Sequence, residues 1–118
     1  MRRHSRLPNA DAAVIERKIT RYLLANDHPA GRAKAVVFRR FGFGSADWRA
    51  LRDALLAHAR AARVVTVSDT EFGTKYVIEG ALRAPDGRRL RLRAVWFVDT
   101  GEAAPRLVTA YAVPGADK

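Results

Sequence analysis

The sequence contains no cysteine, only three histidines, and no apolar run as long as a membrane span. Without cysteine, the chain can have no disulfide framework, no thiol nucleophile and no cysteine-bound metal. Three scattered histidines argue against a metal enzyme. A spanning helix needs about 18–20 consecutive apolar residues. The basic start at residues 1–6 is not followed by an apolar stretch of signal-peptide length. We therefore expect neither a metal nor a membrane among the partners.

The chain has 118 residues, of which 48% are apolar, and 22 Lys+Arg against 12 Asp+Glu give a formal net charge of +10. This length fits one domain over 1–118, with flexible ends expected at 1–8 and 114–118. The charge favours a polyanion such as RNA as partner. Because 18 of the basic residues are Arg and Ala fills 22 positions, GC-rich codon bias would also produce part of the excess. Residues 1–62 hold 13 basic and 5 acidic groups (net +8), against 9 and 7 (net +2) in residues 63–118.

The first half of the chain has apolar residues at helical spacing, which predicts about three helices. One helix is expected to end near Ala25, having begun at residue 11 or 16, and a second is expected over 32–41. The third begins at Ser45, a suitable N-cap, and presents an apolar stripe that includes Leu51 and Leu55. We expect His58 at the exposed surface of this third helix.

The second half of the chain changes to an alternation of period two, which predicts strands. Pro85 and Gly87 mark a turn over 84–88, and a second turn is expected over 100–105. Short turns between successive strands predict an antiparallel meander. The expected fold is α+β, with the helices packed on one face of a four-stranded sheet. The four strands are expected over 63–68, 75–82, 89–98 and 106–113.

The face of the sheet that the helices leave free is the first candidate site. Arg89, Arg91 and Arg93 alternate with apolar residues, so their side chains share one side of their strand and could bind phosphates. An ordinary solvated face is the alternative. On the last strand, Thr109 and Tyr111 are expected on the same side as Leu107 and are either a half-buried site wall or ordinary strand residues.

The loop over 27–34 is the second candidate site. It places His28, Arg32 and Lys34 at or near the start of a helix, where cations, helix dipole and backbone N–H groups together favour an anion. The alternative is that His28 caps the helix or packs in the loop.

These residues match the needs of RNA cleavage without a metal, which are a base, an acid and cations for the charged transition state. We interpret His28, Arg93, Thr109 and Tyr111 as candidate catalytic residues. Candidate phosphate- or RNA-binding residues are Arg32, Lys34, Lys75 and Arg91. No Gly-rich phosphate loop is present, so no nucleotide cofactor, and no other cofactor, is expected.

Motifs along nearly the whole chain resemble a small uncharacterised bacterial family, classed as a domain of unknown function. Its members occur alone or as the last domain of polymorphic-toxin and phage-head proteins. The motifs are Leu-Pro-Asn-Ala-Asp at 7–11, His-Pro-x-Gly-Arg-x-Lys-Ala at 28–35, Arg-x-Val-Trp at 93–96 and Pro-Arg-Leu-Val-Thr-Ala-Tyr at 105–111.

The ending Arg-Leu-Val-Thr-Ala-Tyr is also similar to the last strand of bacterial toxin nucleases of the barnase, colicin, RelE and EndoU-like group. This resemblance implies that Thr109 and Tyr111 line an RNA site with Arg93 and the basic residues of the helical half. Many relatives continue with Pro directly after Tyr, whereas here Ala112 and Val113 intervene.

The leading hypothesis is a metal-independent endoribonuclease toxin that cuts tRNA or another structured RNA by 2′-hydroxyl attack. Such a toxin would act in the bacterial cytoplasm and be neutralised by an acidic antitoxin or immunity protein. The first alternative is a non-catalytic RNA- or protein-binding module with a cystatin-like or similar fold. The second is an antitoxin or immunity partner.

Overall fold

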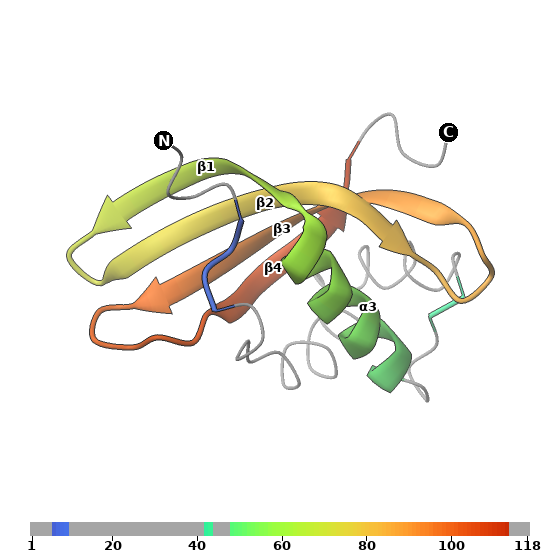
Figure 1. Cartoon of the computed structure of the whole chain (residues 1–118), viewed down its shortest axis with the longest axis horizontal. Coiled ribbons are helices and arrows are strands. Elements are labelled where there is room, and N and C mark those ends of the chain that lie inside the picture. Colours follow the sequence, from blue (N-terminus) through green and yellow to red (C-terminus); the bar gives the residue numbers. More distant parts are fainter. Residues whose placement is uncertain (1–5, 10–41, 44–47, 114–118) are drawn as a thin grey trace, which may run out of the picture.

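The computed structural model describes residues 6–9, 42–43 and 48–113 of the chain. In this part of the chain, one helix precedes a four-stranded antiparallel sheet whose strands lie in sequence order, so the fold is α+β (Figure 1). The elements are α3 (Trp48–Ala61), β1 (Arg63–Thr70), β2 (Gly73–Arg83), β3 (Arg89–Asp99) and β4 (Arg106–Ala112).

The expectation of about three N-terminal helices is wrong, because α3 is the one helix found among the described residues. The two helices expected before residue 42 lie outside those residues. Alanine and arginine favour helix whatever they pack against, so apolar residues at helical spacing in a sequence rich in both do not by themselves fix the number of helices. In α3, by contrast, the apolar stripe has a matching surface on the sheet.

The expected meander of four strands is confirmed, and three of the strands extend further than the alternation suggested. The turn between β2 and β3 forms as its residues predict. Ala84 N–H donates to the Arg88 carbonyl and Gly87 N–H to the Ala84 carbonyl, while Gly87 has φ of +90°. The Asp86 carboxylate accepts from Arg88 N–H at 2.9 Å. This turn sets the β2–β3 register, from Arg83 opposite Arg89 onward.

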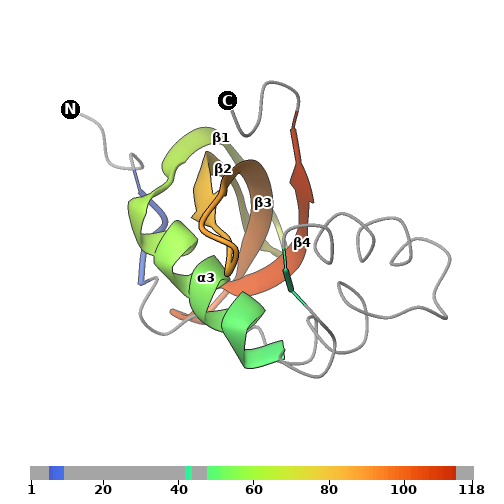
Figure 2. The ribbon, with the colours of Figure 1, turned by 90° about the vertical axis from the view of Figure 1, so that its right-hand side faces the viewer.

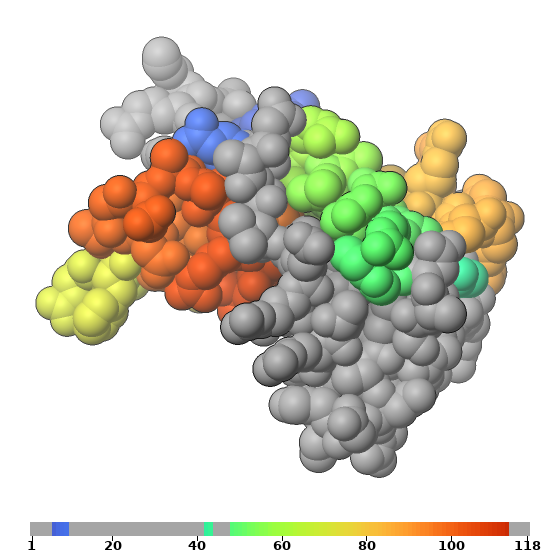
Figure 3. Space-filling model, turned by 90° about the horizontal axis from the view of Figure 1, so that it is seen from below, coloured from blue at the N-terminus to red at the C-terminus, as the bar shows by residue number. Residues whose placement is uncertain are grey.

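The core lies between α3 and the face of the sheet that α3 covers, here called the inner face (Figure 2). Every second residue of β3 from Leu90 to Trp96 is buried, as the alternation predicted, and Trp96 has no exposed surface. Leu51 and Leu55 of α3 are also fully buried. Seen from below, the green surface of α3 lies at one end of the orange-red surface of the β3–β4 hairpin (Figure 3). No helix among the described residues is long and apolar enough to cross a membrane.

His58 is buried in this core, so the expectation that it lies at the surface is wrong. Gly80 of β2 lets the end of α3 approach the sheet closely at this point, because a Cβ on it would lie 3.1 Å from the Ala62 Cβ, with His58 Nε2 at 3.8 Å. His58 Nε2–H donates to the Leu92 carbonyl at 3.0 Å, whereas the buried Nδ1 has no hydrogen-bond partner in the described structure. Burial lowers the pKa of His58, and the hydrogen bond to Leu92 opposes this only in part.

Because the pKa of His58 is lowered on folding, the protein is expected to lose stability in weak acid. His58 of the unfolded chain takes up a proton near the ordinary pKa of about 6.5. Each further unit by which the pH falls then lowers the free energy of unfolding by about 1.4 kcal/mol, until His58 of the folded state also protonates. Stability is therefore complete above pH 6.5 and falls as the pH drops below it. Urea unfolding at pH 7.5 and pH 5 measures the loss. His58→Leu should reduce the slope between them, and an equal slope in both proteins would show that another group is responsible.

Candidate functional site

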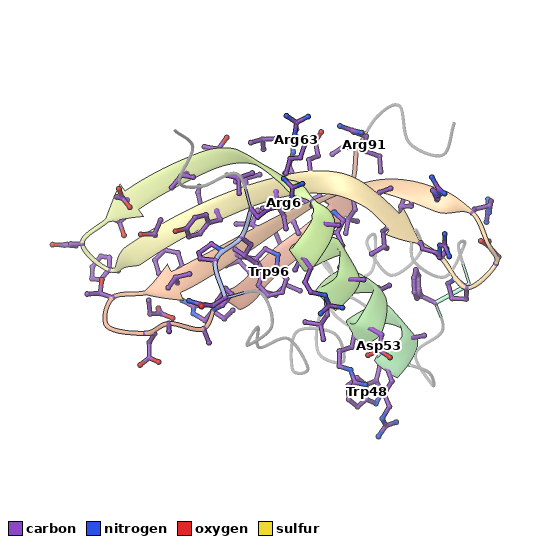
Figure 4. All side chains as sticks on the ribbon, viewed as in Figure 1. Arg6, Trp48, Asp53, Arg63, Arg91 and Trp96 are labelled. Atoms are coloured by element: carbon purple, nitrogen blue, oxygen red, sulfur yellow. The ribbon has the colours of Figure 1, made fainter. Side chains whose placement is uncertain are left out.

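The face of the sheet opposite α3, here called the outer face, carries the charged side chains of the strands. In an antiparallel sheet directly paired residues point to the same side. Figure 4 shows Arg63 and Arg91 projecting away from α3, whereas Trp96 lies on the helix side. The cations that the register places on the outer face are Arg63, Lys75, Arg83, Arg89, Arg91, Arg93 and Arg106, and the acids are Glu79 and Asp99.

At the middle of the outer face, one carboxylate joins two arginines. Glu79 of β2 is paired with Arg93 of β3. Its Oε2 accepts from Arg93 Nε at 2.8 Å and Nη2 at 2.6 Å. Its Oε1 accepts from Arg91 Nε at 3.2 Å and Nη2 at 3.1 Å. The Glu79 side chain is only 14% exposed, against 52% for Arg91 and 40% for Arg93. The carboxylate thus lies beneath two guanidinium groups that face solvent.

The electrostatics of this cluster favour the charged forms of Glu79 and Arg93. The hydrogen bonds from Arg93, together with those from Arg91, lower the pKa of Glu79 although partial burial opposes them. The bond to Glu79, with a side-chain bond to Tyr111, raises the pKa of Arg93. Tyr111 of β4 stands opposite Arg93 in the register. The four residues Glu79, Arg91, Arg93 and Tyr111 are called the central cluster below.

A β-bulge at Val108 decides which side chains of β4 join the outer face. The register steps from Val95 opposite Thr109 to Trp96 opposite Leu107, so β4 has one extra residue there. Thr109 and Tyr111 therefore lie on the outer face, whereas Leu107 is buried on the inner face. The expectation that all three share one side is wrong, because an extra residue reverses the alternation.

Thr109 lies beside the central cluster with a hydroxyl that has no described partner. Its Oγ1 is buried and forms no hydrogen bond within the described part of the chain. A buried hydroxyl without a partner costs free energy, so such groups warrant an explanation. Thr109 and Tyr111 occupy adjacent outer positions of β4, opposite Val95 and Arg93.

The other candidates from the sequence fall in three places. Arg91 belongs to the central cluster. Lys75 lies on the outer face, opposite Phe97 and four positions along β2 from Glu79. His28, Arg32 and Lys34 lie outside the described residues. Whether any of these residues acts on RNA stays a prediction.

Sequence reasoning missed Glu79, the residue that holds the cluster together. A signal for it was present, because the turn at 84–88 fixes the β2–β3 register. Counting outward from the pair Arg83–Arg89 gives Glu79 opposite Arg93. A single acid within an otherwise apolar stretch of a strand, opposite an arginine, predicts an ion pair.

Two chemical capacities follow from this geometry. Two solvent-facing guanidinium groups on adjacent outer positions can bind one phosphate with several N–H donors. An ionised carboxylate and a tyrosine hydroxyl beside them can accept and donate protons. Among the described residues, no three His, Cys, Asp or Glu side chains are grouped so that they could hold a metal ion.

Comparison with known proteins gives a family and a shared fold. The family model described as a domain of unknown function, DUF6883, matches residues 6–114. The chain belongs to this family. The resemblance of its motifs to a domain of unknown function is thereby confirmed. A search of curated proteins gave no match to this DUF6883 chain.

A solved structure shares the fold of the DUF6883 chain. It is described as a contact-dependent growth inhibition toxin–immunity protein complex from Klebsiella pneumoniae 342. The match has a TM-score of 0.65 and 16% identity, and it covers 86% of this chain and 99% of the other. At this identity the likeness shows the fold alone.

Proposed function

We propose that this protein is the toxin of a toxin–immunity or toxin–antitoxin pair, and that it is a metal-independent endoribonuclease. It cuts tRNA or another structured RNA in the bacterial cytoplasm. The observation that carries this proposal is the central cluster, in which Glu79 positions Arg91 and Arg93 beside Tyr111 on a cationic face. A phosphodiester is the ligand that best fits two such arginines with an acid–base pair beside them.

The reaction that fits the cluster is attack by the ribose 2′-hydroxyl on its own phosphate. The 2′-oxygen forms a bond to phosphorus, its proton passes to a base, and the bond to the 5′-oxygen breaks as that oxygen gains a proton. Arg91 and Arg93 stabilise the charge that builds on the phosphate oxygens. The products are a 2′,3′-cyclic phosphate and a 5′-hydroxyl.

Glu79 is proposed as the base, because its carboxylate lies between Arg91 and Arg93, next to the place proposed for the phosphate. Tyr111 is proposed as the acid, with His28 from the first half of the sequence as the alternative donor. The Thr109 hydroxyl, which has no described partner, is proposed to bind a substrate oxygen. Arg32, Lys34 and Lys75 are proposed to bind neighbouring phosphates.

The comparisons support the toxin role through the shared fold with a chain from a growth-inhibition toxin–immunity complex. That complex contains two kinds of protein, so an immunity role for this chain is the second candidate. The net charge of +10 favours the toxin, since a cationic chain attracts RNA and an acidic partner. An acidic immunity protein is therefore the proposed protein partner.

The test is cleavage of RNA in the presence of EDTA. Purified protein is incubated with total RNA and with tRNA transcripts, and the cut position and the chemistry of the new ends are mapped. We expect 2′,3′-cyclic phosphate ends at defined positions. The matched control is the same RNA with a single 2′-deoxynucleotide at the mapped position, which should resist cleavage. Intact wild-type digests, or cleavage of the deoxy substrate at the same bond, would refute the proposal.

A further inference from the structure

One corner of the molecule, away from the central cluster, combines aromatic and cationic groups that the proposed reaction does not use. It is formed where the β1–β2 turn meets the loop after β3. Thr100 N–H donates to the Phe72 carbonyl at 3.0 Å, and Thr100 Oγ1 donates to the Glu71 carbonyl at 3.2 Å. The yellow β1–β2 turn projects at this corner of the molecule (Figure 3). These bonds fix the position of a turn that extends into solvent.

The outer side of this corner is a stack of an arginine on a phenylalanine ring. The Arg106 guanidinium lies 5.2 Å from the centre of the Phe97 ring. Asp99 holds the guanidinium, with Oδ2 accepting from Nε at 2.8 Å and Oδ1 from Nη2 at 3.2 Å. Because the two oxygens each accept one N–H, the plane of the guanidinium is fixed. An Arg plane held in this way is a surface on which a nucleobase can stack.

Phe72 makes this corner apolar as well as cationic. This residue is 71% exposed, and the only other exposed large hydrophobic residue of the described chain is Val65, at 51%. The next residue, Gly73, lies so close to Phe97 that a Cβ on it would be 2.6 Å from that ring. Phe72 is thus the chain neighbour of a residue that packs against the Phe97 ring, and its own carbonyl is bonded to Thr100 in the loop after β3. We call Phe72, Phe97 and Arg106 the aromatic corner.

We propose that the aromatic corner binds an unpaired nucleobase of the RNA whose phosphate lies at the central cluster. This inference rests on the proposed function for its ligand. Phe97 is four residues along β3 from Arg93, on the same face, which is a separation of about 13 Å. A single strand running along the outer face from the cluster reaches the corner within a few nucleotides and passes Lys75 on β2.

Charge and area favour a nucleobase over a protein side chain as the occupant. One exposed phenylalanine is far less apolar surface than a stable protein interface needs. Aromatic rings and arginine planes beside a cationic groove or face are the arrangement that binds single-stranded RNA, each stacked base adding about 1–3 kcal/mol. The corner is thus expected to select RNA with unpaired nucleotides near the cut.

The experiment uses a short single-stranded 2′-O-methyl RNA, which cannot be cleaved, carrying one 2-aminopurine base moved in turn through each position. With wild-type protein, fluorescence should be quenched at a defined position, since stacking quenches 2-aminopurine. Phe72→Ala should abolish that quench and weaken binding roughly 5- to 150-fold, whereas Phe72→Trp should retain both. Val65→Ala is the matched control, since it removes exposed apolar surface from the same sheet, and it should change neither.

The outcomes separate this inference from the proposed function. If quenching and RNA affinity are unchanged in Phe72→Ala, the aromatic corner does not bind a nucleobase, even if the wild type cleaves RNA. A Phe72-dependent quench without any RNA cleavage supports base binding at the aromatic corner and refutes the proposed ribonuclease activity. If Phe72→Ala binds RNA normally but loses affinity for an acidic immunity protein, the corner is a protein contact and the inference is wrong.

Discussion

Replacing Arg93 by alanine is expected to reduce RNA cleavage by about 100- to 1,000-fold, the usual effect of removing one group that stabilises transition-state charge. Arg93 donates twice to Glu79 and bonds Tyr111, so it touches both proposed proton-transfer groups and lies at the proposed phosphate site. Its loss leaves Glu79 with Arg91 as a partner, which should keep the sheet folded. Initial rates on a mapped tRNA site give the size of the effect.

Arg89→Ala is the matched control for this result. Arg89 lies on the same strand and the same face, four residues from Arg93 and opposite Arg83 rather than Glu79. The Arg89→Ala substitution removes the same charge, so it should lower the affinity for RNA modestly and leave the cleavage rate at saturating RNA nearly unchanged. Arg93→Lys retains the charge without the guanidinium fork and should recover little activity. Equal losses in Arg89→Ala and Arg93→Ala would mean that only net charge matters.

Replacing Gly73 by alanine is expected to cost about 2–4 kcal/mol of unfolding free energy, from backbone strain and overpacking together. Gly73 has φ of +150°, a conformation that side chains rarely adopt. A Cβ there would collide with the Val98 carbonyl and lie 2.6 Å from the Phe97 ring and 2.9 Å from the Asp99 Cα. Because two of these atoms belong to the β3 backbone, the β2–β3 pairing would have to shift.

Gly87→Ala separates the two causes of that loss. Gly87 also has positive φ, +90°, but a Cβ on it would meet nothing within 4 Å. Its replacement should cost only the conformational strain, about 1 kcal/mol. Chemical denaturation of the three proteins, followed by circular dichroism, measures the difference. Similar losses in Gly73→Ala and Gly87→Ala would show that the contacts with β3 are not the cause.

The sheet was predictable from the sequence because two independent signals agree there. The alternation over 89–93 assigns the faces of β3, and Pro85, Asp86 and Gly87 provide a turn with a defined geometry. Together they determine the β2–β3 register, and with it the position of Glu79 opposite Arg93. The first half of the sequence has no comparable second signal, and the expected number of helices was wrong.

Two features of the site region could not be predicted, because each depends on a contact between distant segments. His58 has two alanine neighbours in sequence and is buried where α3 meets the sheet, with its Nε2 bonded to the Leu92 carbonyl of β3. The face of Thr109 and Tyr111 relative to Leu107 depends on the bulge at Val108, which no turn residue marks. In both cases the local pattern is compatible with either orientation.

The bulge at Val108 also determines how β4 should be compared among members of the family. Before the bulge the core residue has an odd number, Leu107, and after it an even number, Ala110, because the extra residue shifts the alternation by one. In a relative that lacks the extra residue, an ungapped alignment would place core residues over surface ones on one side of that point. The pair Thr109–Tyr111 should therefore be aligned from the β3 residues opposite it, Val95 and Arg93, and not from Leu107 along its own strand.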